Sequence, residues 1–204
     1  MKRYLYNMQF ILIMVGNLSN FTKIDVLRCL LKIDKSLSRS QLSNLLNLGE
    51  GTIRSILDIL KKNKILMSSK KGHYLSAEGN TIVKKIGNSI NMKEIISNNI
   101  FPDKKKIALH LKNLNKQIKS LVLRDEAVKN GADGALILKF DKKLSLYDQG
   151  YKQDISEIEN MFNLSKDDLV IVAYADSYKL AEHGALAVAI ELNSDLRNII
   201  GKFK

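Results

Sequence analysis

Hydrogen-bond donors gather in one short polar run of this 204-residue chain, Gly51-Thr52-Ile53-Arg54-Ser55. The hydroxyls of Thr52 and Ser55 and the guanidinium of Arg54 are side-chain types that bond base edges and phosphates. Arg54 has the geometry either for a bidentate contact with a guanine or for holding a phosphate, and the sequence leaves both roles open. Such donors contact DNA when they lie at the N-terminal end of a helix that enters the major groove.

The apolar residues around this run predict the helix that would carry it. Ile53, Ile56, Leu57 and Leu60 recur at i, i+3, i+4 and i+7. This spacing is typical of a helix with one buried face, and it extends from about residue 50 to residue 63. The polar residues of the run lie mostly off that face, so they would be offered to a partner.

The segments on either side complete a recognisable order. A shorter helix is predicted just before, because residues 38–41, Ser-Arg-Ser-Gln, have the form of a capping box. Gly49 is expected to supply the left-handed backbone of the turn between the two helices. Residues 65–67 and 73–75 are predicted strands joined by a turn at 69–72. Two helices followed by a hairpin predict a winged helix-turn-helix.

The predicted DNA contacts combine polar groups at the helix start with basic groups around it. The lysines and Arg39 would bond the phosphate backbone, which positions a protein on DNA but reads no sequence. As a cluster that flanks a helix-turn-helix, they favour contact over simple solvation. The predicted DNA-binding set is Arg39, Ser40, Gly51, Thr52, Arg54, Ser55, Lys61, Lys62, Lys70, Lys71 and His73.

Positive charge is concentrated in the same half of the chain. The formal net charge is +12; residues 1–100 carry 16 Lys and Arg against 6 Asp and Glu, whereas residues 101–204 carry 17 against 15. A genome rich in A and T also encodes many lysines, but this does not explain the asymmetry. The first half therefore has the balance of a polyanion-binding domain, and double-stranded DNA is the predicted partner.

Two motifs resemble those of known regulators. Residues 48–54, Leu-Gly-Glu-Gly-Thr-Ile-Arg, and residues 75–79, Leu-Ser-Ala-Glu-Gly, are similar to segments that open the recognition helix and follow the wing in the N-terminal domain of the bacterial central glycolytic gene regulator. More broadly, residues 37–86 resemble winged-helix domains of the multiple-antibiotic-resistance-regulator type. Gly49 stands where a capping serine is usual. The resemblance implies a winged helix that binds DNA.

A third motif, Gly-Ala-Asp-Gly-Ala at residues 131–135, extends the resemblance to the whole chain. It is similar to an archaeal family of two-domain winged-helix proteins whose second domain has no settled function. That resemblance implies an archaeal transcription regulator, and it implies no reaction.

The second half is predicted to alternate strands and helices. Strands are expected at 106–111, 135–140, 144–147 and 168–174, and helices at 116–130, 154–162 and 178–192. This βαββαβ order plus a helix is that of a ferredoxin-like domain. The predicted fold class is therefore α+β, with a winged-helix domain at 1–100 and a ferredoxin-like effector or dimerisation domain at 101–204.

The junction between these domains is predicted to be helical. A helix is expected to begin after Ser76, and Ile95, Ile96 and Ile100 would continue its apolar stripe. Such a helix would link the domains and also serve as the seam of a homodimer.

A small-molecule effector site is predicted around the Gly-Ala motif. Its residues are Arg124, Gly131, Gly134, Asp176 and Ser177, with the glycines and a helix N-terminus forming an anion pocket. The alternative is structural, because Asp176 or Ser177 would also serve as the N-cap of the helix at 178–192.

Other function classes lack their signatures. The histidines at 73, 110 and 183 are isolated, and the single cysteine forms no internal disulfide and favours a reducing compartment. With no phosphate loop or nucleophile elbow, no enzyme, cofactor or metal is predicted. The apolar run 5–15 falls short of the ~20 residues that span a bilayer. We therefore expect no membrane association and a cytoplasmic protein, with residues 1–19 packing on the domain or on a second subunit.

Two functions of different classes follow from the sequence. The first is a dimeric DNA-binding transcription regulator whose second domain senses a ligand or mediates assembly. The alternative is a protein-interaction module, in which the winged helix docks on transcription or RNA-processing machinery.

Overall fold

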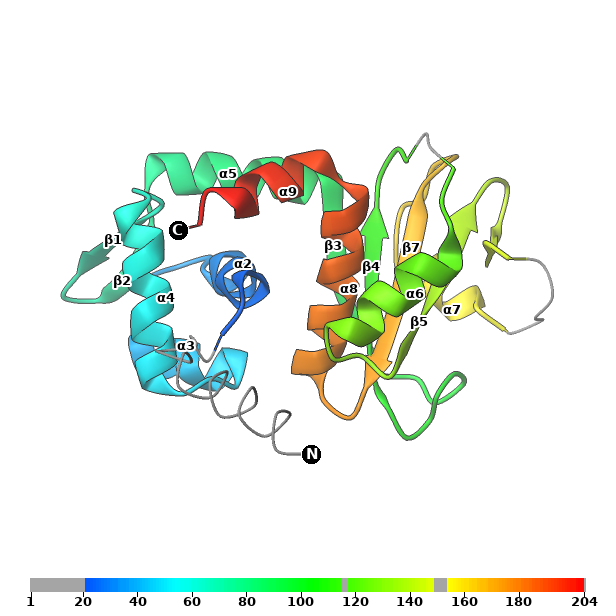
Figure 1. Ribbon diagram of the computed structural model, residues 1–204, viewed down its shortest axis with the longest axis horizontal. Helices are drawn as coiled ribbons and strands as arrows, with labels where there is room; N and C mark the ends of the chain where they lie inside the picture. Colours follow the sequence, from blue (N-terminus) through cyan, green and yellow to red (C-terminus); the bar gives the residue numbers. More distant parts are fainter. Residues whose placement is uncertain (1–20, 115–116, 149–153, 204) are drawn as a thin grey trace, which may run out of the picture.

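A helical N-terminal part and a C-terminal antiparallel sheet make up this mixed α+β molecule (Figure 1). The computed structural model describes residues 21–114, 117–148 and 154–203, so the prediction for residues 1–19 lies outside the described residues. The long helix α8 (Tyr178–Leu192) lies between the two parts, and α2 (Lys23–Lys32) contacts it from the N-terminal side. None of the described helices is long and apolar enough to cross a membrane.

The two central helices of the N-terminal part form as their local signals require. Helix α3 (Arg39–Leu46) begins with the predicted capping box between Ser38 and Gln41. Helix α4 (Glu50–Lys62) buries the predicted face of Ile53, Ile56, Leu57 and Leu60. The left-handed position of the turn is Asn47 (φ 52°), not Gly49, which is extended. Asn ends α3 because asparagine tolerates this conformation better than most residues.

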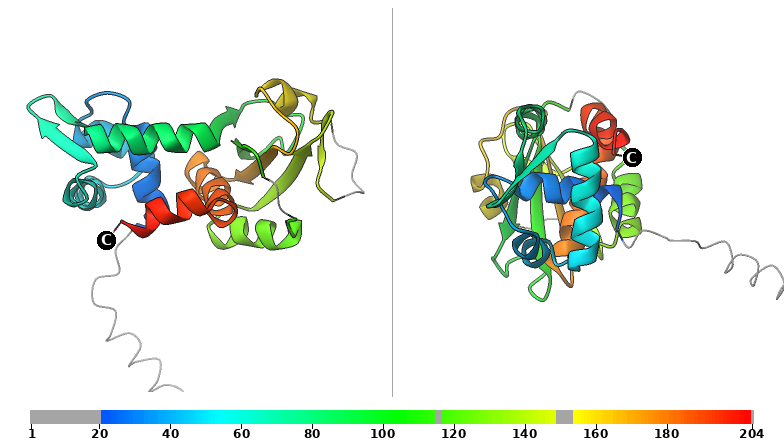
Figure 2. Two further views of the ribbon diagram at one scale, coloured as in Figure 1. Left: turned by 90° about the horizontal axis from the view of Figure 1, so that it is seen from above. Right: turned by 90° about the vertical axis from the view of Figure 1, so that its left-hand side faces the viewer.

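The predicted hairpin also forms, and it is attached to the helices. Strands β1 (Leu66–Ser69) and β2 (Gly72–Leu75) pair antiparallel. Leu37, just before α3, exchanges backbone hydrogen bonds with His73 at 2.8 and 2.9 Å. Figure 2 shows the hairpin projecting from the end of the molecule opposite the sheet. The hairpin therefore has its base fixed to the start of α3.

The predicted linker helix is wrong beyond residue 89. Helix α5 (Ala77–Ser89) is capped by Ser76 as expected, but it passes directly into strand β3 (Ile90–Ile95). Strand β3 pairs along the whole outer edge of β4 (Lys105–Leu111). Ile95 and Ile100, two of the residues expected on the helical seam, are buried inside the chain, and only Ile96 is exposed. Pairing with a distant strand overrides the local helical pattern here.

The predicted βαββαβ order is present in the second half. Its elements are β4, α6 (Ser120–Lys129), β5 (Gly134–Phe140), β6 (Leu144–Leu146), α7 (Ser156–Asn160) and β7 (Leu169–Ala175). The sheet has the order β3-β4-β7-β5-β6, and all neighbours are antiparallel.

The ferredoxin-like arrangement is not confirmed. A ferredoxin-like sheet would place the last strand outside the first, but β3 occupies that edge of β4, and β7 lies between β4 and β5. Helices α6 and α7 also cover opposite faces of this sheet. Alternate residues of β7 pack against α6 and α8 on one face, including Ile171, and against α7 on the other, including Val170.

The C-terminal helix returns to the N-terminal part. Helix α9 (Ser194–Gly201) contacts α2, and Phe203 beyond it is buried (Figure 1). One hydrophobic core runs continuously from α2 to the α8 side of the sheet. The chain thus crosses between the two parts twice, at α5–β3 and at α8–α9, and the domain boundary near residue 100 stays a prediction.

Replacing Gly72 by alanine should destabilise the protein by ~1–3 kcal/mol, because the residue has a left-handed backbone and the new Cβ would lie 2.5 Å from the Leu37 carbonyl oxygen. The measurement is urea unfolding followed by circular dichroism. Gly51→Ala is the matched control: its Cβ meets no atom within 4 Å, so it should stabilise α4 by ~0.5–1 kcal/mol. Equal midpoints for Gly72→Ala and the parent protein would contradict the fixed hairpin.

Candidate nucleic-acid interface

The N-terminal end of α4 is open to a partner. Gly51, Arg54 and Ser55 are exposed, and Thr52 is half-buried. The N-cap residue, Gly49, provides no side-chain hydrogen bond to the first turn, so the amides of this turn lack the side-chain partner that caps α3. A helix N-terminus with free N–H groups attracts anions, including phosphates.

Basic side chains surround this helix without acidic partners. Arg39, Lys62, Lys70 and Lys71 are exposed, and none of them makes an ion pair within the described part of the chain. Lys61, in the last turn of α4, is half-buried and likewise has no ion pair there. Their charge is therefore available to an external polyanion.

His73 marks the place where three elements converge. Burial lowers its pKa, and the positive charges of Lys61 and Arg39 lower it further. The start of α3, the end of α4 and strand β2 therefore meet here. The His73 ring lies 2.9 Å from the Ser68 hydroxyl across the hairpin. The pKa of His73 is thus held below its ordinary value, although the charge of Asp58 acts in the opposite direction.

The predicted DNA-binding residues fall into two groups. Gly51, Thr52, Arg54 and Ser55 lie at the start of α4, where Ser55 also bonds the Gly51 carbonyl at 3.3 Å. Arg39, Ser40, Lys61, Lys62, Lys70, Lys71 and His73 lie around the start of α3, the end of α4 and the hairpin. Thr52 and Lys61 are nine residues apart, so the two groups are separated by ~14 Å along the helix axis.

The predicted effector residues do not share one pocket. Gly131 has a left-handed backbone (φ 97°), and a Cβ there would meet the Leu180 side chain. A Cβ at Gly134 would collide with the Tyr174 side chain. Ser177 caps α8 through the Leu180 amide at 3.3 Å, which is the structural alternative. Asp176 pairs with Lys104 at 2.7 Å. Arg124, on α6, has a buried Nε that finds no hydrogen-bond partner among the described residues.

Asp176 and Ser177 do line a pocket, but with other residues than predicted. This pocket has a volume of about 370 Å³ and lies between the two parts of the molecule. Arg28 and Lys32 of α2 and Glu182 of α8 line it as well, whereas Arg124, Gly131 and Gly134 do not.

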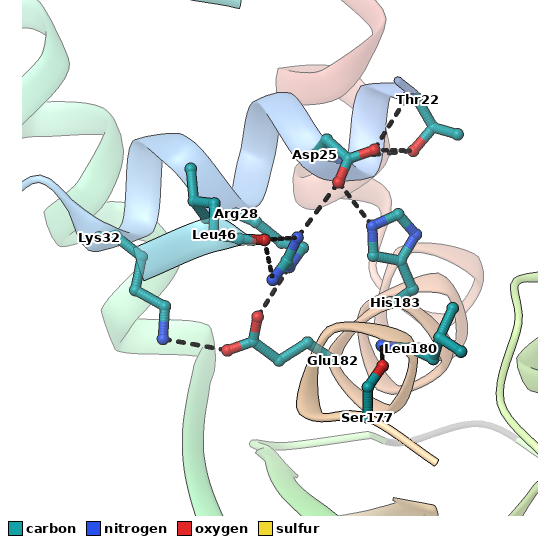
Figure 3. A network of polar contacts seen from close by, with 9 residues as sticks. All are labelled: Thr22, Asp25, Arg28, Lys32, Leu46, Ser177, Leu180, Glu182 and His183. Carbon is teal, nitrogen blue, oxygen red and sulfur yellow. Dashed lines mark hydrogen bonds and ion pairs between the residues drawn. The ribbon is translucent and has the colours of Figure 1, made fainter. Parts of the chain in front are cut away.

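A buried network of charged groups, which sequence reasoning missed, joins α2 to α8 (Figure 3). Arg28 donates to Glu182 at 2.7 Å and to Asp25 at 3.2 Å, and Lys32 bonds the other Glu182 oxygen at 3.0 Å. His183 Nε2 lies 2.7 Å from the Asp25 carboxylate. Lys32 is 35% exposed, while the other four side chains are at most 9% exposed.

The network favours ionised Asp25. Burial by itself would raise the pKa of this carboxyl group. The hydrogen bonds from His183 and the Thr22 amide, together with the charges of His183 and Arg28, outweigh burial and hold the pKa well below its ordinary value of 3.8. Asp25 is therefore a permanent anion that fixes Arg28.

The network also reaches the helix pair. Both terminal nitrogens of Arg28 donate to the Leu46 carbonyl oxygen at 3.3 Å. Leu46 is the last residue of α3, whose final carbonyls have no partner within the helix. The sequence did contain a signal for the network. Two pairs of ionisable residues interrupt otherwise apolar helix faces: Asp25 and Arg28 on α2, and Glu182 and His183 on α8.

Residues 22–81 match a family model described as the PH0730-like N-terminal domain, and residues 102–192 match a domain of unknown function (DUF4443). The solved structure of hypothetical protein PH0730 from Pyrococcus horikoshii OT3 is 27% identical, with a TM-score of 0.74. The match covers 88% of this chain and 100% of that one. The chain is thus similar to this archaeal protein over nearly its whole length.

Two further comparisons carry no argument about function. S. agalactiae BusR, solved in complex with its busAB-promotor DNA, is 12% identical over 84% of this chain and 97% of that one, with a TM-score of 0.24. No curated protein matches the chain.

The network should be essential for stability. Arg28→Met would leave Asp25 and Glu182 buried without their main partner, so we expect a loss of ~3–5 kcal/mol in the free energy of unfolding. Urea unfolding at neutral pH measures it. Lys85→Met is the matched control, since it breaks an ion pair with Asp195 whose side chains are 57% and 51% exposed, and it should cost at most ~1 kcal/mol. A similar loss in both variants would contradict the role of burial.

Proposed function

We propose that this protein is a DNA-binding transcription regulator of the winged helix-turn-helix type. In this proposal α3 and α4 are the helix-turn-helix, α4 is the recognition helix in the major groove, and the β1–β2 hairpin is the wing. The second half senses a ligand or mediates assembly, the protein acts in the cytoplasm as a homodimer on two half-sites, and it performs no catalysis.

One observation carries the proposal. Exposed donors at the start of α4 and unpaired basic side chains near its other end and on the hairpin are carried by one helix and its flanks, and none of these basic side chains forms an ion pair among the described residues. Unpaired surface cations spaced along a helix and an adjoining hairpin suit a polyanion, because phosphate contacts supply much of the affinity for DNA. The resemblance of residues 48–54 and 75–79 to winged-helix regulators supports the same function.

The roles of the two groups of residues differ in this proposal. Thr52, Arg54 and Ser55 would face base edges, since they lie in the first two turns of α4. Lys70 and Lys71, at the hairpin turn, would bond phosphates beside the groove. A protein-interaction module remains the alternative outcome, and salt and sequence dependence of DNA binding distinguish the two.

Arg54→Ala should weaken binding to the specific site by about 1–3 kcal/mol while leaving binding to unrelated DNA nearly unchanged, because a base contact carries discrimination. Mobility shift with the DNA upstream of the chain's own gene measures both affinities. Arg197→Ala, at an exposed arginine of α9 already paired with Glu191, serves as the control and should change neither. Weak binding of the parent protein to all DNA alike, abolished by moderate salt, would count against a regulator.

The double change Lys70→Ala with Lys71→Ala should reduce the slope of log affinity against log salt by roughly 2, since each lysine that touches a phosphate releases about one counterion. Fluorescence anisotropy at several salt concentrations gives the slope. Lys142→Ala with Lys143→Ala is the matched control: these lysines are also an exposed pair, between β5 and β6 of the sheet. An unchanged slope in the first variant would refute the wing.

A further inference from the structure

A second site is suggested by two pockets at the junction of the two parts. Their volumes are about 350 and 370 Å³, and both are lined by Lys32, Glu94 and Glu182. The first pocket brings together α2, the end of α5, residues 90–94 of β3, and single residues of β4 and α8. It therefore lies at the place where α5 passes directly into β3.

The first pocket has an apolar wall of small-ligand size. Leu31 comes from α2, Val83 and Ile86 from α5, Ile90 from β3 and Ile107 from β4. A volume of about 350 Å³ is at the lower end of the range for small-molecule sites. The wall suits one branched or aromatic side chain.

The charges at the pocket are balanced, with two lysines and two glutamates. Glu182 already forms ion pairs with Arg28 and Lys32. Lys93 points away from the pocket and donates a hydrogen bond to the Met161 carbonyl oxygen. The Glu94 side chain is exposed and makes no hydrogen bond or ion pair with the described residues. The Lys32 ammonium has three donors, and its one partner in the described residues is Glu182.

We propose that this junction pocket binds an apolar L-α-amino acid, such as leucine, as a zwitterion. The ligand carboxylate pairs with Lys32, its ammonium pairs with Glu94, and its side chain packs on the apolar wall. A ligand with a net negative charge would face Glu94 and Glu182, and a ligand with a net positive charge would face Lys32. A zwitterion meets an opposite charge at both ends.

The site is connected to the helix pair by direct contacts. Lys32 bonds Glu182, Glu182 bonds Arg28, and Arg28 bonds the last carbonyl of α3, just before the turn into α4. A ligand that bonds Lys32 therefore acts, through Glu182, on Arg28, the group that holds the end of α3. This regulatory consequence rests on the proposed DNA binding, whereas the ligand site itself does not.

Isothermal titration calorimetry of the full chain without DNA tests the site. L-leucine should bind with a dissociation constant tighter than about 1 mM. Three probes each lack one feature of leucine: 4-methylpentanoate lacks the amine, 3-methylbutylamine lacks the carboxylate, and glycine lacks the side chain. Each should bind at least about tenfold more weakly. Equal binding of leucine and 4-methylpentanoate, or no binding of leucine, overturns the proposal.

Two variants locate the binding. A Cβ at Gly87, which lines the pocket on α5, meets no atom within 4 Å, so Gly87→Phe has room to fold and its ring should block leucine. Gly87→Ala should retain binding. Glu94→Gln should weaken leucine about tenfold, and Glu78→Gln, at an exposed glutamate outside the pocket, should not. Unchanged binding in Gly87→Phe or Glu94→Gln overturns the assigned site.

DNA binding is measured separately, with and without leucine, on the same protein. Leucine binding without DNA binding would refute the proposed regulator and keep the ligand site. DNA binding without leucine binding would do the reverse.

Discussion

The packing of α2 against α8 depends on a network of charged side chains that are buried together. Ionised groups lose several kcal/mol of hydration on burial, so each needs near-ideal partners. Glu182 accepts from Arg28 and Lys32, while Asp25 accepts from Arg28, His183 and the Thr22 amide. These bonds are directional, whereas the apolar contacts around them are not. The network thus sets the orientation in which the N-terminal helices sit on the sheet domain.

The same network fixes the position of α3 and, through α3, that of α4. Helix α3 is only eight residues long, too short to be stable on its own in water. Its start is held by the capping box and by the Leu37–His73 bonds, and its end by the two Arg28 donors at Leu46. Helix α4 begins four residues later, so its exposed donors are positioned by a buried arginine that never reaches the surface.

What could be predicted from the sequence was local. The capping box at Ser38 and the buried face of α4 depend on residues within one or two turns, and both are confirmed. Strand β3 was missed because its stability comes from pairing with β4, and nothing in residues 90–95 reveals that partner. The ferredoxin-like arrangement is not confirmed for the same reason, since β3 takes the edge that the last strand would need.

The candidate sites divide in the same way. The polar run 51–55 is contiguous in sequence, so its exposure on one helix end could be inferred. The charge network and the junction pocket are assembled from α2, α5, β3 and α8, and no spacing in the sequence links these elements. The Gly-Ala motif signals that another group comes close to the backbone without saying which group it is. At Gly134 the Tyr174 side chain comes close, and the effector site stays a prediction.

Charged side chains are paired at one end of the helical part, whereas basic side chains are unpaired at the other. At the junction with the sheet, the acidic groups of α2 and α8 are paired, so this region adds little to the external field. Around α4 and the hairpin, exposed basic groups have no acidic partner in the described structure, so the field there is positive. Arg28 belongs to the paired group and contacts the last residue of α3, so the junction is bonded directly to the turn that leads into α4. In the proposed regulator, this separation would let a ligand alter the pairing at one end while the contact surface at the other end stays intact.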